Sequence, residues 1–202
     1  MTQKQLDEIK VLSANCRGIR DKKKRFDVLN YLQNTSADIL CLQDTHLTES
    51  DKSEVTTVWN GNFILNGAYS NARGVAIFFS NKFEYEILNH DQDIDGNLLI
   101  VDLQISQTKI KVINIYGPNA DNPAFYASVL NKIQSSDHDY IIWCGDFNMT
   151  LDPSMDSYNY NSINNPRARN YVNNLMSECN FIDLFRHYNP NLKWYTWHKQ
   201  IH

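Results

Sequence analysis

Two polar side chains that could hydrolyse a phosphodiester follow a short apolar run. Asp146 and Asn148 come directly after the apolar residues 140–144 and Gly145. A carboxylate can hold or deprotonate water, and a neighbouring carboxamide can orient that water or donate to a phosphoryl oxygen. The run is too short for a helix and predicts a buried strand, whose alternation would place both side chains on the same side. A strand that merely ends in a polar turn is the alternative.

Other apolar runs also end in polar residues. Asn15 follows the run at residues 9–14, and Asp44 follows the run at 37–43. If these strands lie side by side, Asn15, Asp44 and Asp146 form a cluster of hard oxygen ligands suited to Mg²⁺. Tyr116 ends the run at 109–116, although a core or edge tyrosine is the alternative. Asn119 follows in the loop, as His46 follows Asp44, and His46 is either a phosphate ligand or an exposed loop histidine.

The elements that would position these residues are strands alternating with helices. Strands are predicted at residues 9–14, 37–43, 74–80, 83–87, 99–105, 109–116 and 139–146. A helix at 22–34 has Asp21 as N-cap and Phe26, Leu29 and Leu32 at helical spacing. A second helix begins at Asn122-Pro123, and a third carries Tyr171, Val172, Leu175 and Met176. This order implies an α/β sandwich with its site at the carboxyl ends of the strands.

Two polar segments are not expected to form a functional site. Residues 152–165 are rich in Asn, Ser and Tyr and predict a long surface loop. Residues 91–102 nearly fit a calcium-binding EF-hand loop, but both flanks predict strands rather than helices. Asp95-Gly96 is therefore expected to form a hairpin turn.

Composition restricts the class of protein. The 202 residues, 42% of them hydrophobic, suit one large globular domain spanning residues 1–202. The four cysteines form no C-x-x-C pair, so reduced thiols are expected rather than disulfides or a metal cluster. No run of about 18 apolar residues is present, and the polar first ten residues contain no targeting signal. We therefore expect an intracellular protein that does not associate with membranes.

The net charge of −4 does not attract nucleic acid globally, so DNA would have to meet a local basic patch. The candidates are Arg17, residues 22–25, Arg73, Arg167 and Arg169. A solvated surface role is the alternative for each of them.

Five ordered motifs carry a family resemblance. They are S-A-N-C-R-G at 13–18, L-Q-D-T-H at 42–46, N-I-Y-G-P-N at 114–119, G-D-F-N at 145–148 and Y-T-W at 195–197. The chain resembles the endonuclease/exonuclease/phosphatase superfamily. It looks most like the apurinic-type endonuclease domain of LINE-type (non-LTR) retrotransposons.

The resemblance implies a four-layer α/β sandwich, in which two packed mixed β-sheets are flanked by helices. It implies a phosphodiesterase dependent on Mg²⁺, with Mn²⁺ as the alternative, that nicks target DNA for retrotransposition and leaves a 3′-hydroxyl. The partners would be DNA and a reverse transcriptase domain in the parent polyprotein, and the site of action would be nuclear.

The resemblance also implies residue roles. Asn15 and Asp44 match the metal site, and Tyr116 matches the tyrosine that contacts phosphate. Asp146 and Asn148 match the residues that align water and hold the scissile phosphate. Asn119 and Thr196 match positions near the DNA.

The sequence departs from the family in two places. Position 44 is usually Glu, and Asp is one methylene shorter. The family's catalytic Asp-His pair and its last two strands have no counterpart, so the domain is expected to be incomplete at its C-terminus. Two other functions stay open: an abasic-site repair endonuclease, exonuclease or phosphatase of the same superfamily, and a retrotransposon remnant without catalytic activity.

Overall fold

A computed structural model describes residues 8–67, 72–134, 137–158 and 164–196. The chain forms two compact units. The sheet unit comprises Met1–Gly117 and Ile133–Asp146, and the helical unit comprises Pro118–Lys132 and Phe147–His202. Each unit is described by itself.

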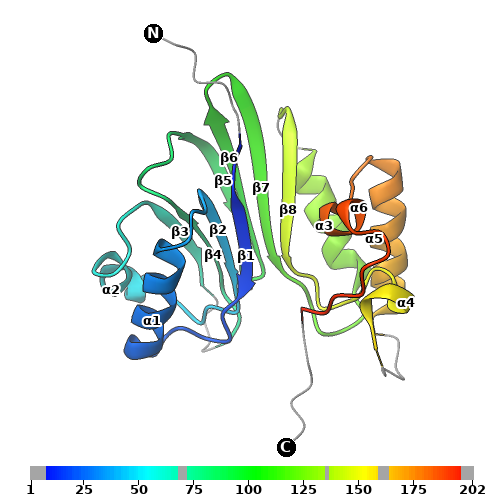
Figure 1. Cartoon of the computed structure of the whole chain (residues 1–202), viewed down its shortest axis with the longest axis horizontal. Helices are drawn as coiled ribbons and strands as arrows, with labels where there is room; N and C mark the ends of the chain where they lie inside the picture. The colour runs from blue at the N-terminus through cyan, green and yellow to red at the C-terminus, as the bar shows by residue number, and fades with distance from the viewer. Residues whose placement is uncertain (1–7, 68–71, 135–136, 159–163, 197–202) are drawn as a thin grey trace, which may run out of the picture. The chain divides into compact units, whose positions relative to one another are not determined.

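Two four-stranded mixed sheets make up the sheet unit (Figure 1). Sheet A has the order β1-β2-β4-β3 and sheet B the order β5-β6-β7-β8. The strands are β1 (Val11–Asn15), β2 (Ile39–Gln43), β3 (Phe63–Asn66), β4 (Val75–Phe79), β5 (Glu86–Gln92), β6 (Leu98–Ile105), β7 (Thr108–Tyr116) and β8 (Tyr140–Asp146). The pairs β1–β2 and β7–β8 are parallel, and the other pairs are antiparallel.

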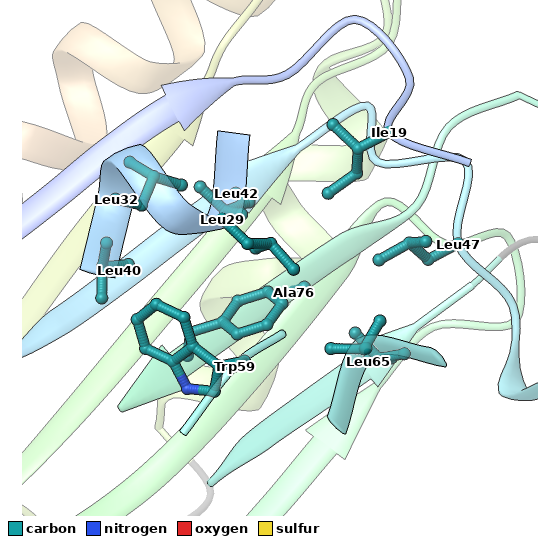
Figure 2. Close-up of a cluster of buried hydrophobic side chains, with 11 residues drawn as sticks. Ile19, Leu29, Leu32, Leu40, Leu42, Leu47, Trp59, Leu65 and Ala76 are labelled. Carbon is teal, nitrogen blue, oxygen red and sulfur yellow. The ribbon is translucent and has the colours of Figure 1, made fainter. Parts of the chain in front are cut away.

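The outer face of sheet A packs against helix α1 (Lys22–Gln33). Because strand side chains alternate between faces, Leu40 and Leu42 of β2 point outward into this core, which Figure 2 shows. The predicted helix is confirmed, but its buried face is not the expected one. Arg25 is 1% exposed, whereas Phe26 is 52% exposed, so the buried spacing is Arg25, Leu29 and Leu32.

The inner faces of the two sheets pack against each other. The core between them includes Ile39 and Cys41 of sheet A with Leu99, Val101 and Val112 of sheet B. Among the described elements, β1 lies opposite β8, and β2 lies opposite β7 and β8. Four strands that end in predicted site residues or just before them, β1, β2, β7 and β8, therefore meet across one interface.

Other elements of the sheet unit refine the sequence analysis. The short helices η1 (Glu49–Asp51) and α2 (Lys52–Thr56) and the strand β3 were not predicted. Strand β5 begins at Glu86, so most of the strand expected at 83–87 is irregular. The hairpin at Asp95-Gly96 is confirmed, because β5 and β6 pair on either side of it. The Asp93 carboxylate accepts the backbone N–H groups of Asn97 (2.8 Å) and Leu98 (2.9 Å) in this turn.

Four helices belong wholly or almost wholly to the helical unit. They are α3 (Pro123–Ile133), α4 (Pro153–Asp156), α5 (Pro166–Glu178) and α6 (Leu184–Tyr188). Val172 and Leu175 of α5 are buried, which confirms their predicted spacing. The segment predicted as one long loop, 152–165, contains α4. The Asp152 side chain starts this helix by accepting the Ser154 N–H at 2.9 Å.

The predicted class, an α/β fold with two packed mixed sheets and flanking helices, is confirmed. The expectation that two further strands are missing stays a prediction. No helix among the described residues combines the length and apolar character needed to span a membrane.

Candidate active site

The ends of the two sheets are joined by a contact between predicted site residues. The Asn15 Nδ2 at the end of β1 donates to the Asp146 Oδ2 at the end of β8, at 2.9 Å. The Asn15 Oδ1 accepts the Arg17 backbone N–H, also at 2.9 Å, which fixes the orientation of the amide. Residues 131 positions apart in the chain are thus neighbours. They meet because the two sheets pack face to face, and not because β1 and β8 lie side by side in one sheet, which was the condition of the strand-end prediction.

Asp146 is positioned by close backbone packing between β7 and β8. In the parallel register Asp146 pairs with Tyr116, and the Asp146 carbonyl accepts the Gly117 N–H at 2.7 Å. Gly145 has φ +139°, and a Cβ there would lie 2.1 Å from the Ile115 carbonyl oxygen. Only glycine therefore allows this approach, which places the Tyr116 and Asp146 backbones side by side.

The prediction that strand alternation delivers Asn148 together with Asp146 is wrong. Strand β8 ends at Asp146, and Asn148 has a left-handed φ of 50° in the loop beyond it. Alternation applies only within extended backbone, so it cannot orient Asn148. Asn148 belongs to the helical unit.

A second acidic group lies at the end of β2. The Asp44 Oδ1 is 3.0 Å from the His46 Nε2, and their side chains are 19% and 30% exposed. Both residues have left-handed backbones, with φ of 52° and 57°. The His46 ring covers Gly18, where an added Cβ would lie 2.6 Å from the His46 Nδ1. Such residues each cost about 1–3 kcal/mol and concentrate at functional sites.

The loop leaving β1 is held by two cations of α1. The Lys24 Nζ donates to the Arg17 carbonyl at 2.6 Å, and the Arg25 Nη1 donates to the Arg20 carbonyl at 2.8 Å. The buried Arg25 guanidinium also pairs with Glu54 of α2. The hypothesis that Arg25 contacts DNA is therefore wrong, because its donors are used inside the protein. Lys22 and Lys23 are exposed and stay candidates.

The donor set at the end of sheet A fits a hard divalent cation. Asp44 supplies a carboxylate directly after β2, and the Asn15 amide stands at the end of the adjacent parallel strand, where Asn15 pairs with Gln43. No group of three or more His, Cys, Asp or Glu side chains in the described part of the chain could hold a metal together. Mg²⁺ matches such a set, because it retains several waters and needs only one or two carboxylates.

The cysteines near this site are poor nucleophiles. Burial raises the pKa of the Cys16 thiol to about 12, because the opposing effect of Lys24 is smaller than that of burial and the Asp44 carboxylate acts in the same direction as burial. The pKa of the fully buried Cys41 is also raised, chiefly by a hydrogen bond with Cys144 and by burial. All four cysteines are free, as predicted.

The loops of the helical unit that carry Asn119 and Asn148 are joined by one side chain. The Asn165 Nδ2 donates to the Asn148 carbonyl at 2.9 Å and to the Pro118 carbonyl at 3.3 Å. Asn165 is only 5% exposed and precedes α5. The Tyr126 hydroxyl supports the same region by donating to the Phe147 carbonyl at 2.7 Å.

The predicted DNA contacts differ in their surroundings. Arg17 is exposed beside Asn15. The Arg167 side chain is 73% exposed, and its Nε lies 3.5 Å from the Asp121 carboxylate. The Nη1 of Arg169 is buried. The exposed Arg73 lies 4.0 Å from Asp95. Thr196 is exposed at the end of the described residues, and Trp197 of the same motif lies outside them.

Sequence reasoning missed four side chains that shape this site. Arg25 looked like one member of a cationic run, and helical spacing from Leu29 and Leu32 was the signal that could have found it. His46 was not assigned a contact with Asp44. Gln43 and Asn114 were quoted only within motifs, yet they are 1% and 0% exposed.

Comparison with known proteins agrees with this geometry. Residues 12–200 match the Endonuclease/Exonuclease/phosphatase family. The chain is 26% identical over 196 residues to the transposon TX1 uncharacterized 149 kDa protein of Xenopus laevis, covering 94% of this chain but only 14% of that protein. It is 25% identical over 209 residues to an exodeoxyribonuclease of Bacillus subtilis strain 168, covering 94% and 79% of the two chains.

A solved structure has the same fold. The apurinic endonuclease of Archaeoglobus fulgidus superposes with a TM-score of 0.69 at 22% identity, covering 95% of this chain and 79% of that one. Two packed mixed sheets with flanking helices define a protein of the α/β-sandwich class. The chain belongs to the Endonuclease/Exonuclease/phosphatase family.

Proposed function

We propose that this chain is a divalent-metal-dependent DNA endonuclease that nicks target DNA for retrotransposition. The observation that carries the proposal is the 2.9 Å hydrogen bond from the Asn15 Nδ2 to the Asp146 Oδ2. This bond places the amide of Asn15, one of the two proposed metal ligands, against the carboxylate of Asp146, which is proposed to act on water. The likeness to a transposon protein supports the retrotransposition role.

Asp146 is the group that acts on the attacking water. Asn15 donates to the Oδ2 of this carboxylate and orients it, and the carboxylate accepts a proton from the water while the water oxygen bonds to phosphorus. The bond between phosphorus and O3′ breaks, and O3′ takes up a proton to leave a 3′-hydroxyl and a 5′-phosphate. The Tyr116 hydroxyl, whose backbone pairs with that of Asp146, donates to a phosphoryl oxygen.

Asp44 and Asn15 would hold the cation, Mg²⁺ or Mn²⁺. When bound, it supplies charge neutralisation at the phosphate. His46, 3.0 Å from the Asp44 Oδ1, orients that carboxylate so that Oδ2 stays available. Asn148, Asn119 and Thr196 remain the proposed contacts to the phosphate and the DNA.

Nicking of supercoiled plasmid tests the proposal. The wild-type protein should nick DNA with Mg²⁺ but not with EDTA, and Asp146→Asn should lower the rate by about 10²- to 10⁴-fold. Asp27→Ala, which removes an exposed carboxylate of α1, is the matched control and should retain the wild-type rate. Equal nicking by Asp146→Asn and wild type would contradict the assignment. If the folded chain is inactive, the same pair is compared in the parent polyprotein.

A repair nuclease is the second candidate, because the chain covers 79% of the Bacillus subtilis exodeoxyribonuclease. An oligonucleotide duplex with one abasic site, assayed beside the undamaged duplex, separates the two functions. Cleavage confined to the abasic duplex favours repair, whereas nicking of both favours target-DNA cleavage.

A further inference from the structure

A buried polar bridge connects the two sheets directly beneath the candidate site. The Gln43 Nε2 of sheet A donates to the Asn114 Oδ1 of sheet B at 2.7 Å. The Asn114 Nδ2 in turn donates to the Leu42 carbonyl at 3.0 Å and the Ala76 carbonyl at 2.9 Å. The Asn114 side chain of β7 is therefore hydrogen-bonded to the backbones of both β2 and β4. Gln43 is 1% and Asn114 is 0% exposed.

This bridge interrupts an interface that is otherwise packed with apolar side chains, among them Ile77, Leu99 and Val112. Net stability is a weak reason for it, since replacing both partners of a buried hydrogen bond by apolar groups of similar shape can be nearly neutral. Hydrogen bonds differ from apolar packing in being directional. A bridge between sheets therefore restricts sliding of one sheet over the other, which apolar contacts permit at low cost.

The bridge residues lie at most two residues from the candidate residues along their strands. Gln43 directly precedes Asp44 and pairs with Asn15 in the parallel register. Asn114 stands two residues before Tyr116 on the same face of β7 and pairs with Cys144, which is two residues before Asp146. Two residues of strand rise about 6.6 Å. Moving the bridge would therefore also move the nearby ends of β2 and β7, and with them the groups that orient the Asp44 and Asp146 carboxylates.

We propose that Gln43 and Asn114 are positioning residues that hold the two sheets in register, so that Asn15 and Asp44 face Tyr116 and Asp146. The inference rests on the proposed function of that site. It predicts that the bridge controls turnover without controlling cation affinity, because Asn15 and Asp44 both lie on sheet A, whereas Asp146 lies on sheet B.

Apolar replacement separates positioning from stability. Gln43→Met or Asn114→Leu alone leaves a buried amide without its partner and should lower the urea midpoint. The double variant removes both amides but leaves the Leu42 and Ala76 carbonyls without the Asn114 donor, so it should recover only part of that midpoint. Its kcat should stay about 10- to 100-fold below wild type. Its Mn²⁺ dissociation constant, measured by electron paramagnetic resonance without DNA, should change less than about twofold. Val112→Ala, an inner-face variant away from the strand ends, should be destabilised but keep the wild-type kcat.

A double variant with wild-type kcat would overturn the proposal. A parallel loss of Mn²⁺ affinity would also overturn it, because the effect would then be local to Asp44.

A cross-linking assay tests the bridge without using activity. In a background with Cys16, Cys144 and Cys179 replaced by serine, Asn15→Cys with Asp146→Cys places two thiols where the amide and carboxylate now touch. Oxidation should join them about 10-fold more slowly when the bridge is apolar. Equal cross-linking rates would overturn the inference whether or not the protein cleaves DNA. Slower cross-linking, together with no nuclease activity in the chain that keeps Asn15 and Asp146, would reject only the proposed function.

Discussion

The sheet unit and the helical unit hold their candidate residues by different means. In the sheet unit, Asn15, Tyr116 and Asp146 end strands whose register is fixed by many backbone hydrogen bonds. In the helical unit, Asn119 and Asn148 lie in loops that are supported by separate side-chain hydrogen bonds, among them those of Asn164 and Asn165. A strand end is held cooperatively, whereas a loop held by separate side-chain hydrogen bonds can shift when one of them is lost. Substitutions should therefore have larger effects in the sheet unit.

The largest effect is expected at Asp44. Asp44→Asn keeps the shape and tolerates the left-handed φ of 52°, so the fold should persist while the charge is lost. Nicking should fall by at least about 10²-fold, and the Mg²⁺ concentration for half-maximal rate should rise. A magnesium titration of plasmid nicking measures both quantities. Asp93→Asn, which changes a hairpin carboxylate, is the control, and equal behaviour of the two variants would argue against a metal role for Asp44.

A smaller effect is expected at Arg25, which acts through the loop leaving β1. Arg25→Met leaves the Arg20 carbonyl without its donor and should lower the free energy of unfolding by about 2 kcal/mol. The value is modest because the Glu54 side chain is 58% exposed and can be solvated. Turnover should fall about tenfold as Asn15 loses its support.

Urea unfolding and steady-state nicking measure these changes. Arg25→Lys should retain part of the free energy of unfolding and of the turnover that Arg25→Met loses, and Lys23→Met should change neither quantity. Wild-type turnover in Arg25→Met would show that the loop is positioned without Arg25.

The sequence predicts the sheet unit well because short apolar runs, and the polar residues that end them, mark the strands there. Apolar runs that end in Asn15, Asp44 and Asp146 are confirmed as β1, β2 and β8, whereas the contact of Asn15 with Asp146 arises from the packing of sheet A on sheet B. The polar bridge could not be predicted. Gln43 and Asn114 become partners only through packing of two sheets, and their separation of 71 residues leaves no local signal.

The helical unit was less predictable for a physical reason. Asn148 takes a left-handed backbone, so the alternation that oriented Asp146 no longer applied. Helix α4 has four residues, too few to show a helical period, and only its Asp152 cap marks it. Arg25 shows the same limit within the sheet unit, because a cationic run does not reveal which member turns inward. Tertiary partners decide these positions.

Asn165 offers a weaker test of the helical unit. Asn165→Asp keeps the size and the tolerance for its φ of 49° but loses both N–H donors. The loops at Pro118 and Asn148 should loosen, which should lower turnover about threefold and the free energy of unfolding by about 1 kcal/mol. Asn170→Asp on the exposed face of α5 is the control. If Asn165→Asp lost as much turnover as Asp44→Asn, the expected difference between the two units would be contradicted.

The smallest effects are expected for exposed arginines, where the two units can be compared directly. Each true phosphate contact contributes about 0.9 to the slope of log K against log salt, so Arg17→Gln should flatten the slope by about that amount. Arg167→Gln should flatten it less, because the nearby Asp121 carboxylate already compensates part of the Arg167 charge. Fluorescence anisotropy of labelled duplex between about 50 and 200 mM salt measures the slopes. Lys82→Gln, which lies beyond the end of β4 that pairs with the start of β2, should leave the slope unchanged, and a slope unaltered by Arg17→Gln would place the DNA elsewhere.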